Sequence, residues 1–265
     1  MDLRPIDAIQ DTMTILTCGD NYAYVCRCGE DCVFVVDPTD AAMVLRVLQE
    51  QRLTLTAALA THHHADHTAG LAELKSETGC RVIGPDMQRI AGIDGLVRNG
   101  ETVRLGDQTA EVIGTPGHTR TSVCYHLPAT AGGGPGSVFT GDTLFVGGCG
   151  RPMECHAQTL WKSLQRLAAL PEETLLWCGH NYTAENYAFG LTIEPNNKAI
   201  REQLDKTRHA AAEGRPSVPS TIGREKATNV FLRAGDSNLQ AALGMAQASC
   251  ERVFAELRRR KNLFG

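Results

Sequence analysis

Short apolar runs separated by turn residues dominate the chain up to about residue 180. The runs at 13–18, 21–28 and 32–36 are separated by Gly19-Asp20 and by Gly29-Glu30-Asp31, which predicts three strands joined by hairpins. Similar runs predict strands at residues 55–60, 81–83, 102–105, 109–113, 122–127, 137–140 and 174–178. Apolar residues at helical spacing predict helices at 41–51 and 71–78.

The pattern changes character from about Tyr182. Apolar residues at helical spacing predict helices at residues 184–193, 198–212 and 237–261, with Asn196 or Asn197 as the cap of the second. Residues 214–233, rich in Pro, Ser and Thr, are interpreted as irregular. Strands followed by helices predict a sheet-based domain at residues 1–181 and a helical domain at residues 182–265.

The segment Thr61–His67 concentrates residues that bind metals. It places His62, His64, Asp66 and His67 directly after an apolar run that predicts a buried strand. His62 and His64 are two positions apart and therefore point to the same side of extended backbone, whereas His63 points away and is interpreted as a residue outside the ligand set. Asp66 and His67, where the chain turns into a helix, can face a second point in space.

Three further predicted strands end in a residue of the same kind. They lead into His118, Asp142 and His180. Because ligand sites gather at strand ends in sheets with helical connections, we expect these residues to join the histidine cluster in one site. The alternative is a histidine-rich surface loop that binds nothing, but that reading does not explain why the other three share the strand-end position. His126, His156 and His209 are interpreted as packing or surface residues.

The donor set predicts two divalent metal ions. His62, His64 and His118 would hold one ion with an open position for water, while Asp66, His67 and His180 would hold the second. Asp142 has two carboxylate oxygens and can bridge them. Imidazole and carboxylate ligands favour zinc, with iron or manganese as alternatives. Two such ions can lower the pKa of a shared water to about 7, which supplies a nucleophile for an acyl or phosphoryl centre.

Composition excludes several other classes. The net charge is −4 and the pI is near 6.1, so the chain has no long-range attraction to nucleic acid. No apolar run approaches the roughly 18 residues of a membrane span. The N-terminus shows no export signal, so ten irregularly spaced cysteines indicate reduced thiols and a cytoplasmic location. The Cys26, Cys28 and Cys32 trio lacks a fourth ligand and is interpreted as packed in a hairpin. The glycine-rich run at 131–136 is interpreted as a flexible hairpin connection.

Thr61–His67 resembles the T-H-x-H-x-D-H signature of the metallo-β-lactamase superfamily, with His118, Asp142 and His180 where its later motifs fall. More narrowly, the chain resembles the glyoxalase II, or hydroxyacylglutathione hydrolase, family. The matching segments are residues 115–119, 139–145, 148–150, 178–180, 182–183, 194–195, 218–221, 229–233 and 258–261. The first motif marks only the superfamily, whereas the matches in the helical part are specific to this hydrolase.

This resemblance implies a fold and an activity. The fold is a metallo-β-lactamase-like αββα sandwich with a C-terminal helical domain that binds glutathione. The activity is hydrolysis of S-D-lactoylglutathione to glutathione and D-lactate by a metal-bound hydroxide, the second step of methylglyoxal detoxification. Asp66 and Asp142 would take part in catalysis, Asp66 by orienting the hydroxide. We expect a monomer whose partner is this small glutathione thioester, with no role for nucleic acid or membrane.

The resemblance also implies the residues that contact glutathione. They are Arg151, Tyr182, Arg258 and Lys261. Cationic side chains suit this thiol because it carries a carboxylate at each end. For Arg258 and Lys261, the alternative is a solvated helix end whose cations favour the helix dipole.

Three residues depart from the family pattern. Met153 replaces an aromatic residue, Cys155 a glycine and Asn181 a glutamate. None is a predicted ligand, so they bear on the acyl group and thiol carrier rather than on the reaction type. The alternative functions are a persulfide dioxygenase with one iron, which lacks the helical domain, a nuclease, which the acidic balance disfavours, and a zinc-stabilised binding module.

Overall fold

The computed structural model describes residues 13–129 and 134–264. The chain divides into two compact units. The first unit runs to Gly114 and includes Thr121–Gly141, and the second comprises Thr115–Arg120 and everything from Asp142 onward. The predicted hairpin connection at 131–136 lies in part outside the described residues, as does the N-terminal segment.

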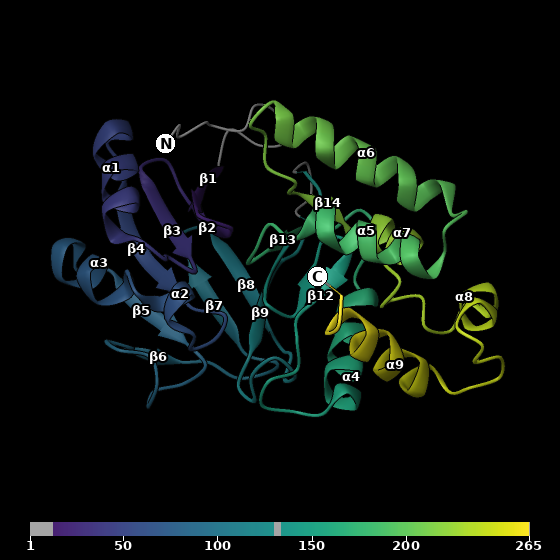
Figure 1. The fold of residues 1–265 in the computed structure, drawn as a ribbon. Helices are drawn as coiled ribbons and strands as arrows, with labels where there is room; N and C mark the ends of the chain where they lie inside the picture. The colour runs from purple at the N-terminus through teal and green to yellow at the C-terminus, as the bar shows by residue number, and fades with distance from the viewer. Residues whose placement is uncertain (1–12, 130–133, 265) are drawn as a thin grey trace. The chain divides into compact units, whose positions relative to one another are not determined.

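The first unit contains a sheet of six strands in chain order (Figure 1). These are β1 (Met13–Cys18), β2 (Asn21–Arg27), β3 (Cys32–Val36), β4 (Thr54–Leu59), β5 (Arg81–Gly84) and β6 (Gly95–Leu96). Pairing is antiparallel from β1 to β3 and parallel from β3 to β6. Parallel neighbours require a crossover connection, which contains α1 (Ala41–Gln51) between β3 and β4 and α3 (Leu71–Thr78) between β4 and β5.

The core of this sheet explains why the two helices form. Val44 and Val47 of α1 and Leu74 of α3 are fully or almost fully buried against Val33 and Val35 of β3. Asp40 starts α1 by accepting hydrogen bonds from the backbone N–H groups of residues 42 and 43. The short α2 (Ala65–Thr68) lies between β4 and α3 in the sequence.

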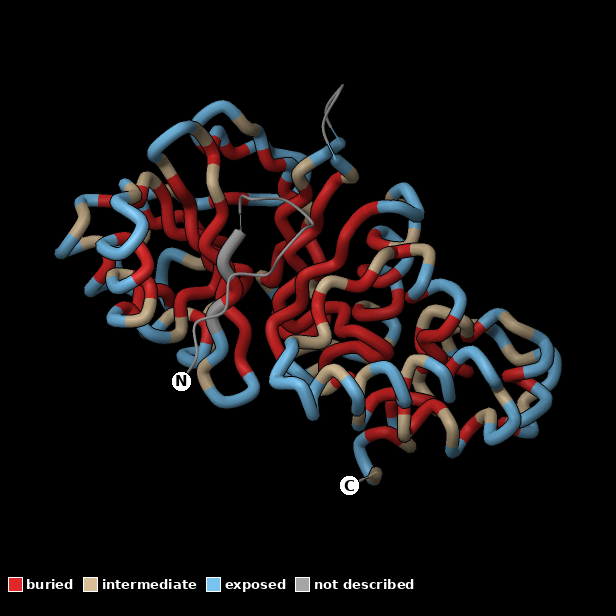
Figure 2. Tube along the Cα trace, turned by 90° about the horizontal axis from the view of Figure 1, so that it is seen from above, coloured by how far each residue is buried: buried red, intermediate tan, exposed pale blue. Residues whose placement is uncertain are grey.

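A second set of four strands completes the first unit. It consists of β7 (Thr102–Leu105), β8 (Gln108–Gly114), β9 (Val123–Leu127) and β10 (Ser137–Gly141), each antiparallel to the next. Rings on β2, β3 and β10 pack together, with Phe139 5.4 Å from Tyr24 and 6.2 Å from Phe34 between ring centroids. The buried residues follow the strands, as the red segments of Figure 2 show.

The second unit is mainly helical. Its strands are β11 (Leu144–Phe145), β12 (Gly148–Cys149), β13 (Leu175–Cys178) and β14 (Ser220–Thr221). Its helices are α4 (Ala157–Ala168), α5 (Thr183–Ile193), α6 (Lys198–Ala212), α7 (Ile222–Thr228), α8 (Ser237–Ala242) and α9 (Cys250–Lys261). Buried aromatic rings join them, since Phe254 of α9 lies 5.5 Å from Trp161 of α4 and 6.0 Å from Phe231. Asn197 caps α6, as one of the two predicted caps.

The helical pattern was predicted less well than the strands. The continuous helix expected at 237–261 is wrong, because α8 ends at Ala242 and α9 begins at Cys250. Gly244 has a φ of 70° and Ser249 caps α9, so both residues favour a break. The stretch 214–233 contains α7, capped by Thr221, and α4 is not among the predicted helices. None of the described helices is both long enough and apolar enough to span a bilayer.

Candidate metal centre

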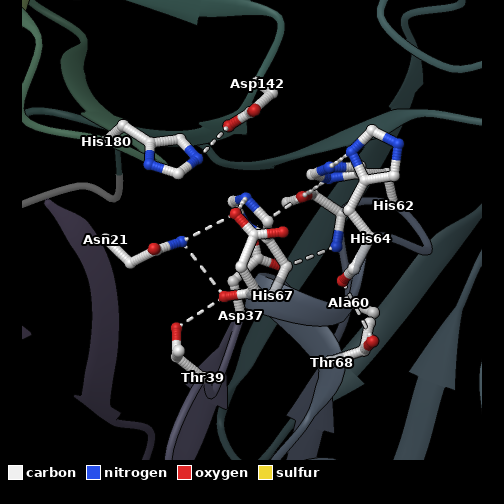
Figure 3. A network of polar contacts seen from close by, with 12 residues as sticks. Asn21, Asp37, Thr39, Ala60, His62, His64, His67, Thr68, Asp142 and His180 are labelled. Carbon is white, nitrogen blue, oxygen red and sulfur yellow. Dashed lines mark hydrogen bonds and ion pairs between the residues drawn. The ribbon is translucent and has the colours of Figure 1, made fainter. Parts of the chain in front are cut away.

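The segment Thr61–His67 of the first unit brings imidazole nitrogens together. It follows β4, and His64 is the N-cap residue of α2. The Nε2 atom of His62 lies 3.1 Å from Nδ1 of His64, so the two rings direct nitrogens to one point (Figure 3). His62 and His67 are almost fully buried. The structure thus brings His62 and His64 together, and their role as ligands of one metal ion stays a prediction.

Asp37 is a buried carboxylate that sequence reasoning did not assign to the site. It follows β3 and has a φ of 49°. Its Oδ1 atom accepts from the backbone N–H of Thr61 at 2.7 Å, and its Oδ2 atom accepts from the Thr61 hydroxyl at 2.7 Å and contacts Nδ1 of His67 at 3.0 Å. An ionised carboxylate only accepts, so Nδ1 of His67 carries the proton and its Nε2 keeps a lone pair for a metal. In the sequence, Asp37 is marked only by its position directly after the predicted strand at 32–36.

Asp66 is held beside His67 by polar residues of the first sheet. Its Oδ2 atom lies 3.6 Å from Nε2 of His67 and 3.2 Å from Nδ2 of Asn21. Asn21 also donates to the backbone oxygen of Asp66 at 3.1 Å, and the Thr39 hydroxyl donates to the same oxygen at 2.7 Å (Figure 3). The Asp66 side chain is 48% exposed, so its carboxylate can reach both a metal and solvent.

The second unit places the other three predicted ligands together. Asp142 follows β10, His180 follows β13 and His118 lies in the segment 115–120. The Oδ2 atom of Asp142 lies 3.4 Å from Nε2 of His118, and its Oδ1 atom lies 3.4 Å from Nε2 of His180. Nδ1 of His118 contacts the carbonyl of Arg151 at 2.8 Å. A carbonyl oxygen only accepts, so Nδ1 carries the proton and Nε2 keeps a lone pair for a metal. Asp142 thus presents one oxygen to each imidazole.

These separations fit metal ligands. Two ligands about 2.0–2.1 Å from one tetrahedral zinc ion are roughly 3.4 Å apart. The carboxylate–imidazole separations in both units are 3.4–3.6 Å, longer than a charge-assisted hydrogen bond. Within the first unit, Asp37, His62 and His67 also bring donor atoms together, but the oxygens of Asp37 are already occupied by protein donors. The remaining donors are nitrogen and carboxylate oxygen, which suit zinc, iron or manganese.

Cysteine sulfur does not compete with these donors in the second unit. Burial raises the pKa of the Cys178 thiol to about 12. Burial also raises the pKa of Cys149, although Arg258 opposes that shift. Neither cysteine belongs to a candidate ligand group among the described residues, and the Cys178 sulfur donates to the His180 carbonyl.

His63 is directed to a cation on the loop that follows β5. Its Nε2 atom contacts an Arg89 guanidinium nitrogen at 3.1 Å, and the Arg89 Nε atom donates to Asp86 at 2.7 Å. Burial tends to raise the pKa of Asp86, but Arg89 and two backbone N–H groups lower it overall. His63 belongs to none of the candidate ligand groups among the described residues, in keeping with its predicted exclusion.

The turn Gly147–Arg151 is fixed by buried side chains of α7 and the loop after it. The fully buried Glu225 accepts from the Gly147 N–H at 2.8 Å, the Ser220 hydroxyl at 2.5 Å and the Asn229 amide at 3.0 Å. Asn229 also donates to the Gly148 carbonyl at 2.9 Å. Burial raises the pKa of Glu225. Sequence analysis missed this carboxylate because nothing nearby in the chain marks it.

Gly150 brings this turn against Asp142. A Cβ atom at position 150 would lie 1.8 Å from the Asp142 carbonyl oxygen. No residue with a Cβ atom fits there. The backbone of residues 148–151 can therefore approach Asp142 only with glycine at this position.

Arg258 and Lys261 are largely buried. Arg258 donates to the Cys149 carbonyl at 2.8 Å and to Asn262 at 3.1 Å, and its guanidinium lies 5.1 Å from the centre of the Phe231 ring. Lys261 pairs with Glu185 and lies near the rings of two phenylalanines. Arg258 therefore supports the turn. Because its side chain is largely buried, the alternative of a solvated helix end does not describe this residue.

The remaining residues singled out from the sequence lie as follows. Tyr182 stacks on His180 with ring centroids 4.9 Å apart and planes 5° from parallel, and Arg151 is exposed. Met153 is 63% exposed, while Asn181 accepts from Ser217. Burial raises the pKa of Cys155. His126 pairs with Glu111 and His209 with Glu213, which agrees with packing and surface roles.

Two family models match the chain. The metallo-β-lactamase superfamily model matches residues 16–180, and the model of the hydroxyacylglutathione hydrolase C-terminus matches residues 181–264. The ETHE1 structure from Myxococcus xanthus is similar with a TM-score of 0.66 and 27% identity, covering 94% of this chain and 91% of that one. The BLEG-1 B3 metallo-β-lactamase structure has a TM-score of 0.59 at 24% identity, covering 80% and 94%, and shows the fold alone.

Curated relatives extend over nearly the whole chain. A hydroxyacylglutathione hydrolase of Cereibacter sphaeroides is 42% identical over 257 residues, covering 96% of this chain and 99% of its own. A protein of the same name from Methylococcus capsulatus is 43% identical over 248 residues, covering 92% and 95%. The fold and the histidine–aspartate groups thus define a member of the metallo-β-lactamase superfamily, which confirms the predicted fold class. Within it, the chain belongs to the hydroxyacylglutathione hydrolase family.

Proposed function

We propose that this chain hydrolyses 2-hydroxyacyl thioesters of glutathione, with S-D-lactoylglutathione as the substrate and glutathione and D-lactate as products. One combination of observations supports the proposal. Both units present nitrogen and oxygen donors that suit divalent metal ions, and the match to hydroxyacylglutathione hydrolases includes the C-terminal helices. The persulfide dioxygenase alternative lacks these helices, so the match to residues 181–264 disfavours it.

The donors of the two units would form one centre for two divalent metal ions. His62, His64 and His118 would hold the first ion, Asp66, His67 and His180 the second, and Asp142 would bridge. The two oxygens of Asp142, each 3.4 Å from a different imidazole nitrogen, support the bridging role. Zinc suits these ligands, with iron or manganese as alternatives. The proposal includes the division into a metal domain at residues 1–181 and a glutathione-binding domain at residues 182–265.

The chemistry divides between the ions and the protein. When bound, a pair of divalent ions makes a hydroxide available at neutral pH and polarises a carbonyl oxygen. Asp37 keeps the proton of His67 on Nδ1, and the Arg151 carbonyl does the same for His118. Asn21 restrains Asp66, whose exposed carboxylate would orient the attacking oxygen toward the thioester carbonyl. The thiolate leaves without a strong acid, because a free thiol has a pKa of only about 8.5.

The glutathione portion would be recognised by residues of the second unit. Arg151 and Tyr182 stand beside the ligands, Arg151 through its carbonyl on His118 and Tyr182 by stacking on His180. Arg258 and Lys261 would supply positive charge for a glutathione carboxylate, although both also have protein partners. We further propose that the protein acts as a cytoplasmic monomer.

The test combines a substrate assay with a metal count. Purified protein is given S-D-lactoylglutathione, thioester loss and oxygen uptake are followed, and bound metal is measured by mass spectrometry. Because the ions contribute several kcal/mol to the transition state, Asp142→Ala should lower kcat by about 1,000-fold or more and leave at most one ion per chain. His209→Ala, on exposed α6, serves as the control and should match the wild type.

Two results would contradict the proposal. Wild-type protein with two bound ions that leaves the thioester intact would refute the substrate. An Asp142→Ala protein that keeps two ions and its full kcat would refute the bridging role. Oxygen uptake with glutathione persulfide would instead favour the dioxygenase alternative.

A further inference from the structure

Two cysteines at the end of the β2–β3 hairpin lie face to face. The backbone N–H of Cys28 donates to the Cys32 carbonyl at 2.9 Å, which continues the β2–β3 register by one pair beyond Arg27 and Val33. Opposite residues of a hydrogen-bonded antiparallel pair have Cα atoms about 5.5 Å apart, within the range of disulfide-linked cysteines. The two sulfur atoms are 3.5 Å apart, so small side-chain rotations would bring them to bonding distance.

The two thiols differ in environment. Cys28 is almost completely buried, whereas Cys32 is partly exposed at the hairpin turn. Burial raises the pKa of Cys28 to about 11, and the neighbouring Cys32 sulfur adds to the shift while a hydrogen bond with Thr56 opposes it. An oxidant from solvent therefore reaches Cys32 first, while the buried Cys28 remains a protonated thiol.

Cys28 and Cys32 are not part of a candidate metal site among the described residues. Cys26 is the nearest further cysteine in the sequence, but it is buried and its sulfur is directed to the Tyr24 carbonyl. Among the described residues, no group of three metal-type donors includes any of these cysteines. This agrees with the interpretation of the trio as hairpin packing and leaves the close sulfur pair without an assigned role.

The surrounding backbone holds the two sulfurs at this distance. A Cβ atom at Gly29 would lie 2.6 Å from the Cys32 sulfur, and one at Gly106 would lie 2.0 Å from the Cys28 carbonyl oxygen. That same carbonyl accepts from the Asp107 N–H at 2.8 Å. The turn between β7 and β8 therefore restrains Cys28, while the absence of a side chain at position 29 leaves room for the Cys32 sulfur.

We propose that Cys28 and Cys32 form a redox modification site, in which hydrogen peroxide converts the two thiols to a reversible disulfide across the hairpin. The Cys32 sulfur attacks one peroxide oxygen, the O–O bond breaks, and the departing hydroxide takes a proton to become water. The Cys28 sulfur then attacks the sulfur of the Cys32 sulfenic acid, and the S–O bond breaks to release a second water. Two thiols lose two electrons and one peroxide gains them. The inference does not rest on the proposed hydrolase activity.

The test uses the full chain and reads mass rather than activity. Trypsin cuts after Arg27 and Arg46, so one peptide carries both cysteines and no other. After mild peroxide, denaturation and alkylation, we expect this peptide to lack two hydrogens and to resist alkylation until it is reduced with dithiothreitol. Cys250 is partly exposed on its own tryptic peptide and should still be alkylated.

Three variants sharpen the result. Cys32→Ser should leave Cys28 fully open to alkylation, because the first reacting sulfur is gone. Cys28→Ser should leave Cys32 as a sulfenic acid that dimedone traps. Gly29→Ala should slow disulfide formation, because the added methyl displaces the Cys32 sulfur. The proposal is overturned if peroxide that oxidises Cys250 leaves both cysteines alkylated, or if Cys32 proceeds to sulfinic acid in the wild type.

Discussion

The segment Thr61–His67 and the turn Gly147–Arg151 both carry residues of the candidate site, but different contacts hold them. Thr61–His67 is supported by Asp37 and Asn21 from the neighbouring strands of its own sheet. The turn is supported by Glu225 and Arg258, which lie 78 and 109 positions from the residues they bind. The predicted ligands of the first unit are thus positioned by their own sheet, whereas the turn of the second unit depends on helices from the end of the chain.

This difference predicts separable effects of substitution. Changes around Thr61–His67 should act on metal binding, since four of the predicted ligands lie there. Changes around the turn should act on stability and on KM, since the turn carries Arg151 and the backbone beside Asp142. The predictions below test that division.

The largest effect is expected from Asp37. In Asp37→Asn, the amide must place its NH₂ group toward either Thr61 or His67, and the proton of His67 then moves to Nε2 in part of the molecules. Metal affinity should fall by about 10–100-fold, as for other groups that orient ligands. Chelator competition measures the loss, and circular dichroism checks that the variant is folded.

Asp37→Ala should add a loss of stability to the loss of metal. It leaves the buried Thr61 N–H without its acceptor, at a cost of about 1–3 kcal/mol. Thr56→Val, on β4 away from the histidines, is the control and should retain both ions. Equal metal affinity in Asp37→Asn and the wild type would contradict the inference that Asp37 orients the His67 imidazole.

The next effect concerns Glu225. Glu225→Ala removes the acceptor for three donors and should lower the free energy of unfolding by about 3 kcal/mol. Glu225→Gln should be milder, because its oxygen can serve Gly147 and Asn229 while its NH₂ donates to the Ser220 hydroxyl. Thermal unfolding of both variants measures the difference.

The pH dependence of the Glu225→Gln comparison has a defined sign. Burial raises the pKa of Glu225, so the folded protein holds this proton more tightly than the unfolded chain does. Stability therefore decreases as pH rises from the ordinary value of 4.5 through the higher folded pKa. Glu225→Gln lacks this loss, so its Tm relative to the wild type should rise over that interval. A difference independent of pH would contradict the raised pKa.

A smaller effect is expected at Arg258. Arg258→Met loses the contact with the Cys149 carbonyl, so the free energy of unfolding should fall by about 1.5–3 kcal/mol, as for other hydrogen bonds from charged groups, and KM should rise because the turn is less restrained. Arg258→Lys keeps the charge but not the fork that serves both Cys149 and Asn262, so it should restore KM only in part. Arg259→Met, at an exposed arginine, is the control. Full recovery of KM by lysine would show that charge alone matters here.

The smallest effect is expected at Asn21. Asn21→Ala removes two contacts to Asp66, whose side chain is already half exposed, so affinity for one of the two ions should fall by about 10-fold or less. Metal titration of the variant measures it. Thr39→Val removes only a contact to the backbone of Asp66 and should have less effect still. A larger loss in Thr39→Val would indicate that the backbone of α2, rather than the carboxylate, is what must be held.

The positions of several strands could be predicted because their signals are local. Apolar runs marked β2, β3, β4, β9, β10 and β13, and within each unit the metal-type residues at strand ends lie close together. The assembly of both groups into one two-metal centre stays a prediction. The segment at α4 and the break between α8 and α9 escaped notice, because helix packing in the second unit depends on partners such as Phe254 that are distant in sequence.

Residues that support the site could not be predicted for the same reason. Glu225 looks like a surface residue of a short helix, and only the tertiary structure buries it under the turn at Gly147. Arg258 stands in a run of cations that ordinarily marks a solvated helix end. Asp37 was visible as the end of a strand, but its two hydrogen bonds to Thr61 depend on the parallel pairing of β3 with β4.

The close approach of Gly150 to Asp142 limits how this enzyme can evolve. A single methyl group at that position would collide with main-chain atoms, so selection cannot introduce a side chain there. Variation is left to the side chains that follow, where Met153 is open to solvent and Cys155 is partly so. Directed libraries for altered thioester preference should therefore begin at those two positions and leave the glycine untouched.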